Sequence, residues 1–136
     1  AAEMRARTEA IDRHLGTVTA LVPGALEEAQ NRLRERLAQL LGDALEPQRL
    51  AQEAAILVDK GNINEECERL ASHLEQVREA LGEGGQVAKR LNFLFQEMHR
   101  EVNTMGSKTQ NLEITRAVIA MKEEIETLRE QVQNLE

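Results

Sequence analysis

The stretch from Arg90 to Lys108 reads RLNFLFQEMHREVNTMGSK and predicts one long helix. Its apolar residues follow one another at intervals of three or four, which places them along one side of a helix. The polar residues between them are amides, guanidiniums and carboxylates, whereas an ordinary solvated face is rich in lysine, glutamate and alanine. Such a mixture suits either a buried hydrogen-bond network or the binding of a polar ligand. The apolar stripe consists of Leu91, Leu94, Met98, Val102 and Met105.

Similar apolar stripes run through the rest of the chain, so the sequence predicts helices throughout and no strand. We expect Pro23 to end the first helix and to open the second, because a residue without an N–H fits a first helical turn. Glycines near positions 42, 61, 82–85 and 106 predict other helix ends. The predicted helices cover about residues 4–22, 23–42, 47–60, 63–81, 90–106 and 112–136.

Helices of about 20 residues reach about 30 Å, and narrow apolar stripes on such helices do not build a compact globule. The predicted fold class is therefore all-α, with extended antiparallel helical hairpins or a bundle and coiled-coil-like packing. Narrow stripes also leave surface for other chains to cover, so we expect an oligomer. Residues expected to face inward include Met4, Ile11, Leu15, Val18, Val22, Leu40, Leu57, Val58, Cys67, Ile125, Leu128, Val132 and Leu135.

The composition excludes several classes of protein. With 136 residues there is room for one domain with a modest core. Two phenylalanines, with no tyrosine or tryptophan, disfavour an aromatic platform for stacking bases. The single Cys67 excludes an internal disulfide and is expected to be a buried, inert thiol. No apolar run approaches membrane-spanning length, so we expect no membrane partner and a reducing, cytoplasmic environment.

A second polar group lies before residues 90–108, at spacings of four, three and four: Asn62, Glu66, Arg69 and His73. At 100° per residue these side chains share an arc of about 60° that borders the apolar face. A carboxylate, a guanidinium and an imidazole so placed suit phosphodiester hydrolysis, in which charge must be stabilised and protons moved. The alternative is that Glu66–Arg69 and Arg69–His73 are ordinary helix-surface pairs.

These two stretches carry a resemblance to a known family. KRLNFLFQEMHREVNTMGSK, at residues 89–108, and NINEECERLASH, at residues 62–73, resemble signature blocks of the YicC/YloC family of bacterial endoribonucleases. The terminal REQVQNLE is also similar to the end of that family's sequences. The resemblance covers essentially the whole chain but only the C-terminal half of a family member. It implies a metal-dependent cut of RNA by an oligomeric protein, expected to be a hexamer in the cytoplasm.

The resemblance implies a role for particular residues. We expect Glu66, Glu97 and Glu101 to bind Mn²⁺ or Mg²⁺ or to orient a metal-bound water. Arg100 is expected to stabilise negative charge on the reacting phosphate, and His73 to transfer a proton. The predicted catalytic residues are thus Glu66, His73, Glu97, Arg100 and Glu101, and Arg69, Arg90 and Lys108 are predicted to contact RNA.

Two positions that are usually aspartate in the family are Asn62 and Asn92 here. An amide brings no charge and is a weaker ligand for Mg²⁺ or Mn²⁺ than a carboxylate. Metal binding is weakened if either aspartate is a ligand in the family, and nothing is lost if both act only at helix ends or interfaces. The sequence leaves both interpretations open.

The net charge of −7 argues against RNA binding by bulk electrostatics. Two interpretations follow: other parts of the assembly supply the basic surface, or this chain binds no RNA by itself. We therefore expect the isolated chain to cleave RNA poorly. The alternative function is a structural oligomerisation module without catalytic residues of its own. We expect residues 1–60 to be N-terminal helices and residues 61–136 the signature region of one helical unit in a longer protein.

Overall fold

The computed structural model describes residues 2–44 and 46–135, and all regular structure in these residues is helical. This confirms the all-α prediction. A short 3-10 helix, Gly42–Ala44, follows the first long helix. The α-helices are α1 (Ala2–Leu41), α2 (Pro47–Asp59), α3 (Asn64–Glu83), α4 (Ala88–Lys108) and α5 (Leu112–Asn134).

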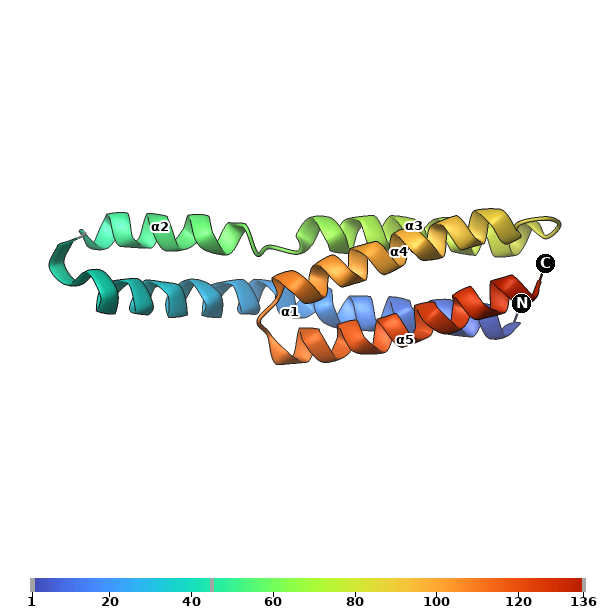
Figure 1. Ribbon diagram of the computed structural model, residues 1–136, viewed down its shortest axis with the longest axis horizontal. Helices are drawn as coiled ribbons and strands as arrows, with labels where there is room; N and C mark the ends of the chain where they lie inside the picture. Colours follow the sequence, from blue (N-terminus) through green and yellow to red (C-terminus); the bar gives the residue numbers. More distant parts are fainter. Residues whose placement is uncertain (1, 45, 136) are drawn as a thin grey trace.

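Four of these helices form a closed ring. Helix α1 packs on α3 and α5, and α4 packs on the same two helices, so each member of the four-helix bundle has two neighbours. Figure 1 shows that neighbours in the ring run in opposite directions. Helix α2 contacts α1 alone among the described helices and continues the line of α3, so α2 and the second half of α1 form an arm that extends beyond the bundle (Figure 1).

One core runs the length of the bundle. All five residues of the apolar stripe in α4 are at most 2% exposed, which confirms the prediction for the signature stretch. The core extends from Met4 to Val132 and so includes residues on both sides of position 60, while the division of the chain there stays a prediction. Cys67 is buried as predicted, and burial raises the pKa of its thiol. No helix in the described residues is long and apolar enough to cross a membrane.

The predicted break at Pro23 is wrong, because α1 continues through this residue to Leu41. A proline inside a helix removes one backbone hydrogen bond and strains the preceding turn, at about 3 kcal/mol. Apolar contacts on both sides of Pro23 oppose that strain. Val22 lies in the core before it, and Leu26 packs against the core after it. Tertiary packing thus overrides the local rule, and one helix of 40 residues replaces two predicted ones.

Three residues that were predicted to face inward are exposed, namely Leu40, Leu57 and Leu135. Leu40 and Leu57 belong to the arm, where two helices cover each other on one side only. In α2 that side is formed by Ala54 and Val58, which are buried. Leu135 follows the last turn of α5 and has no core beside it.

Arginines form ion pairs between α1 and α3 and between α1 and α5. Arg78 on α3 contacts Glu9 at 2.8 Å and Asp12 at 3.0 Å, both on α1. The hydrogen bond from Arg78 lowers the pKa of the Glu9 carboxyl. Arg7 on α1 contacts Glu124 on α5 at 3.1 Å. Several of the chain's acidic residues are therefore engaged by cations within the bundle.

Gly106 lies inside α4 and does not end it, since the helix continues to Lys108. A Cβ atom at this position would lie 3.1 Å from Cγ1 of Val118 on α5. Val118 is buried and β-branched, so its side chain has little freedom to move away. The glycine therefore permits the close approach of α4 and α5 at this level.

We predict that Gly106→Ala gains less stability than Gly16→Ala. Alanine replaces glycine within a helix with a gain of about 0.5–1 kcal/mol when there is room for the methyl group. Gly16 has that room, with no atom within 4 Å of an added Cβ, whereas Gly106 does not. Urea unfolding should show a higher free energy of unfolding for Gly16→Ala and no gain, or a decrease, for Gly106→Ala. Equal gains would contradict the tight packing of α4 against α5.

Candidate functional site

The α3–α4 hairpin places the two polar stretches opposite each other. Its turn contains Gly84 and Gly85, whose φ angles of 70° and 72° lie in the left-handed region that glycine adopts without strain. Beside the turn, Arg90 contacts Glu83 at 2.9 Å. Further from the turn, Arg69 on α3 pairs with Glu101 on α4. The predicted antiparallel pairing of these helices is therefore confirmed.

Arg69 joins the two helices through its guanidinium. Its Nε lies 2.8 Å from both carboxylate oxygens of Glu101, which is only 7% exposed. The remaining nitrogens reach Glu66 at 3.3 Å and Glu65 at 3.4 Å on its own helix. Hydrogen bonding to Glu101 raises the pKa of Arg69, so the guanidinium stays charged. The helix-surface pair Glu66–Arg69 exists, but the contact with Glu101 crosses between helices.

Glu66 is the most deeply buried charged residue of this group, at 2% exposure. Its Oε2 accepts a hydrogen bond from Nζ of Lys108 at 2.9 Å, in addition to the contact with Arg69. Its Oε1 is buried and has no hydrogen-bond partner among the described residues. We call Glu66, Arg69, Glu101 and Lys108 the charge cluster. Two cations balance two carboxylates there, which is the condition under which carboxylates tolerate burial.

The other three predicted catalytic residues lie outside the charge cluster. Glu97 pairs with Arg100 at 3.9 Å, one turn along the same helix, and the Arg100 side chain is 74% exposed. His73 is half-buried, and its Nδ1 is buried without a hydrogen-bond partner in the described part of the chain. The register set by Arg69 and Glu101 puts His73 at about the level of Glu97. The structure thus brings Glu66 and Glu101 together, whereas Glu97 is half-buried and Arg100 faces solvent.

The three residues predicted to contact RNA all make ion pairs within the chain. Arg69 and Lys108 belong to the charge cluster, and Arg90 holds the hairpin turn through Glu83 and Glu79. Another pair of cations was not predicted from the sequence: Arg32 and Arg36 line a cavity together with Lys108. The run NRLRER at residues 31–36 indicates a concentration of positive charge on this helix. The spacing of apolar residues does not show which of these arginines face the cavity.

The three predicted metal ligands are not gathered into one group among the described residues. Among the described residues, no group of three or more histidine, cysteine, aspartate or glutamate side chains is placed to hold a metal ion. Two of the three predicted ligands, Glu66 and Glu101, are engaged by Arg69 and Lys108 instead. The dependence on Mn²⁺ or Mg²⁺ therefore stays a prediction from the family resemblance.

Asn62 has a structural role at the start of α3. Its Oδ1 accepts a hydrogen bond from the backbone N–H of Asn64 at 3.0 Å, just as the helix begins. Asparagine and aspartate both form this kind of turn, because either side chain offers an oxygen to the free N–H group two residues further on. Of the two interpretations left open for this position, the geometry favours the one in which the amide loses nothing. Asn92 is half-buried on α4.

Taken together, these features define an all-helical domain in which buried ion pairs join two helices of a four-helix bundle. A sequence model of the family described as "Endoribonuclease YicC-like, C-terminal" matches residues 18–136. The chain therefore belongs to the YicC-like endoribonuclease family and corresponds to its C-terminal region.

Two relatives show the extent of this similarity. The probable endoribonuclease YicC of Clostridioides difficile is 36% identical over 138 aligned residues, which include all of this chain and 47% of the relative. The protein of the same name from Haemophilus influenzae is 43% identical over 106 residues, or 76% of this chain and 37% of the relative. The chain thus spans less than half the length of either curated relative.

We predict that Glu101→Gln lowers the free energy of unfolding by about 1–3 kcal/mol, because it leaves Arg69 without its buried charged partner. Glu97→Gln makes the same chemical change one turn away on α4, at a carboxylate with a single long contact. That control should stay within about 0.5 kcal/mol of the parent chain. Urea unfolding of both variants measures the difference, and equal effects would show that the charge cluster does not hold α3 against α4.

Proposed function

We propose that this chain is the C-terminal domain of an endoribonuclease, which cuts internal phosphodiester bonds of RNA. The observation that carries the proposal is the family match over residues 18–136, the region that contains both polar stretches. The two relatives are each named as probable endoribonucleases, and the alignment with one of them includes the whole chain. RNA is the proposed substrate of the full-length protein.

The geometry supports different roles for the predicted catalytic residues. Arg100 projects into solvent from the signature helix, so it is available to contact a phosphate and stabilise charge in the transition state. Glu97 lies beside it as the neighbouring carboxylate, and His73 lies at the same level on α3 as the group proposed to move a proton. The charge cluster acts on these residues indirectly, as the set of contacts that fixes α3 against α4.

We predict that Arg100→Ala in the full-length protein slows RNA cleavage by about 100-fold or more, the usual effect of removing a group that stabilises transition-state charge. The assay follows a labelled RNA by gel electrophoresis under single-turnover conditions. Because the Arg100 side chain has one long contact in the described chain, its removal should leave the fold and the assembly mass unchanged. Normal cleavage by this variant would refute the assignment of Arg100.

Two controls use the same cleavage assay, and a third measures the mass of the assembly. EDTA should abolish cleavage by the full-length protein if the divalent metal predicted from the resemblance is required. The 136-residue chain alone should cleave poorly, since it spans less than half of its relatives. Light scattering on each variant separates a catalytic defect from a defect of assembly, because a smaller particle would indicate a structural role for Arg100.

A second function, oligomerisation, is favoured by the position of Phe93. This residue is one of two phenylalanines in the chain, and it is 59% exposed on the otherwise polar side of α4. Aromatic residues are enriched at the centres of protein interfaces, where they bury a large area with few rotatable bonds. We propose that Phe93 packs against another copy of the protein in a homo-oligomer, for which the family resemblance implies a hexamer.

We predict that Phe93→Ser reduces the mass of the assembly at micromolar concentration, as measured by light scattering after size exclusion. The matched control is Leu135→Ser, which removes a similarly exposed apolar side chain at the end of α5. The control should keep the parent mass if Phe93 itself, and not exposed apolar surface in general, forms the interface. If both variants keep the parent mass, Phe93 is not part of a subunit interface.

A further inference from the structure

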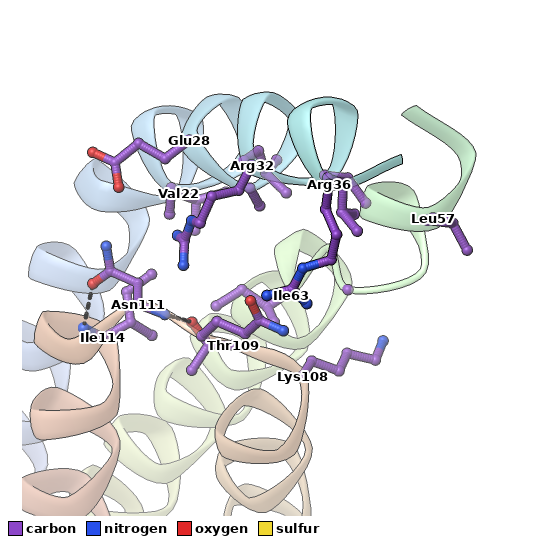
Figure 2. A pocket seen from close by; sticks show the side chains of 17 residues that line it. Val22, Glu28, Arg32, Arg36, Leu57, Ile63, Lys108, Thr109, Asn111 and Ile114 are labelled. Atoms are coloured by element: carbon purple, nitrogen blue, oxygen red, sulfur yellow. Dashed lines mark hydrogen bonds between the residues drawn. The ribbon is translucent and has the colours of Figure 1, made fainter. Parts of the chain in front are cut away.

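A cavity of about 180 Å³ lies where the arm leaves the bundle. Its walls come from the second half of α1, the end of α2 and the connection between α4 and α5. Figure 2 shows the cavity from close by, with α1 above it and the α4–α5 connection below. None of the predicted catalytic residues lines it, so it is separate from the site proposed above.

Two arginines face this cavity from α1. Arg32 and Arg36 lie one helical turn apart, and both guanidiniums extend from the helix toward the α4–α5 connection (Figure 2). Within the part of the chain that the structure describes, neither makes a hydrogen bond or an ion pair. In contrast, Arg34 between them donates to Asn31 at 3.0 Å and does not line the cavity.

The cavity combines this positive charge with apolar side chains. Val22, Leu26, Ile63 and Ile114 contribute to its lining. Lys108 also lines it, although its Nζ is held by Glu66. Glu28 is the carboxylate among the described lining residues, and in Figure 2 it is directed away from the guanidinium of Arg32. The local balance is therefore positive, in a chain whose net charge is −7.

The rim opposite the arginines is fixed by short-range hydrogen bonds. The Asn111 side chain caps α5 by accepting from the backbone N–H of Ile114 at 2.9 Å, and Oγ1 of Thr109 accepts from the N–H of Asn111 at 3.1 Å. Both bonds are drawn in Figure 2. The N-terminus of α5 therefore borders the cavity, and its partial positive charge favours an anion in addition to the arginines.

We propose that this cavity binds one nucleotide of single-stranded RNA, with the phosphate against Arg32 and Arg36 and the base over the apolar lining. Guanidiniums bind phosphate through paired hydrogen bonds and also stack on bases. A volume of about 180 Å³ is below the range of about 300–1,000 Å³ for drug-sized ligands, so it suits a ligand no larger than a single nucleotide. The proposal rests on the proposed function, because it assumes that RNA is the substrate.

The test measures RNA binding by the full-length protein with fluorescence anisotropy of a short, labelled, single-stranded RNA. Arg32→Ala and Arg36→Ala should each weaken binding by about tenfold or more, because each removes a charge-assisted hydrogen bond to phosphate. The dependence of affinity on salt should also become less steep, by roughly 0.7 in the logarithmic slope for each phosphate that is no longer neutralised. Arg32→Lys should retain part of the affinity, because it keeps the charge without the paired geometry.

Arg34→Ala is the matched control, since it removes the same charge from the same helix outside the cavity. Its affinity for RNA should remain within about threefold of the parent value, because an exposed charge distant from the phosphate contributes little at physiological salt. An equal decrease of RNA affinity in Arg34→Ala and Arg32→Ala would overturn the proposal, because it would show that RNA responds to the total charge of the helix and not to the cavity. A change of assembly mass in Arg32→Ala without a change in RNA affinity would also overturn it, since the cavity would then be a subunit interface.

Two further measurements complete the test. Competition by an unlabelled ribomononucleotide, abolished in Arg32→Ala, would support a site for a single nucleotide from any source, and competition only by longer strands would support a site for part of a strand. If the parent protein cleaves RNA while Arg32→Ala and Arg36→Ala bind it normally, the cavity proposal fails and the proposed function stands. If the parent protein neither binds nor cleaves RNA, both proposals fail.

Discussion

The burial of two carboxylates between α3 and α4 is the constraint on which the arrangement of these two helices depends. Glu66 and Glu101 are removed from water, so each needs a cation within hydrogen-bond distance. Arg69 reaches across to Glu101 and thereby sets the register of the hairpin. Lys108 reaches back to Glu66 and holds the end of α4 beside the base of the arm. The level of His73 relative to Glu97 and the position of the cavity both follow from these contacts.

The same constraint explains the unusual composition of the signature helix. Successive residues of an α-helix point about 100° apart, so α4 presents different sides to the core, to α3 and to solvent. Val102 belongs to the apolar stripe, Glu101 faces Arg69, and Arg100 projects outward. Three consecutive residues of α4 thus face the core, α3 and solvent, respectively. A buried network and a solvent-exposed arginine therefore occur together in one helix, so the two interpretations of its polar residues do not exclude each other.

Helical periodicity was enough to predict the stripe of α4, because a continuous apolar side must be covered in any bundle. It could not predict that α1 passes through Pro23, since that depends on contacts of Val22 and Leu26 with distant helices. Nor could it show that α2 is covered on one side only, which leaves Leu57 exposed. The bond between Arg69 and Glu101 joins residues 32 positions apart, and no local spacing contains that information. The spacing placed both residues among the polar groups of their helices, but only tertiary structure pairs them.

Net charge is a poor guide to the local electrostatic field of this acidic chain, because many of its charges are paired. Carboxylates such as Glu9, Glu66 and Glu101 are opposed by arginine or lysine within the bundle, so their local fields are largely cancelled. The cations at Arg32 and Arg36 lie on the arm side of the cavity without such partners in the described chain, and their fields are not cancelled in this way. Electrostatic fields decrease steeply with distance in salt solution, so the field at this cavity depends on these nearby arginines more than on the total of −7. Arg32 and Arg36 lie beyond the end of the bundle because α1 continues through Pro23. The continuous helix therefore forms the wall of the cavity that carries the two arginines.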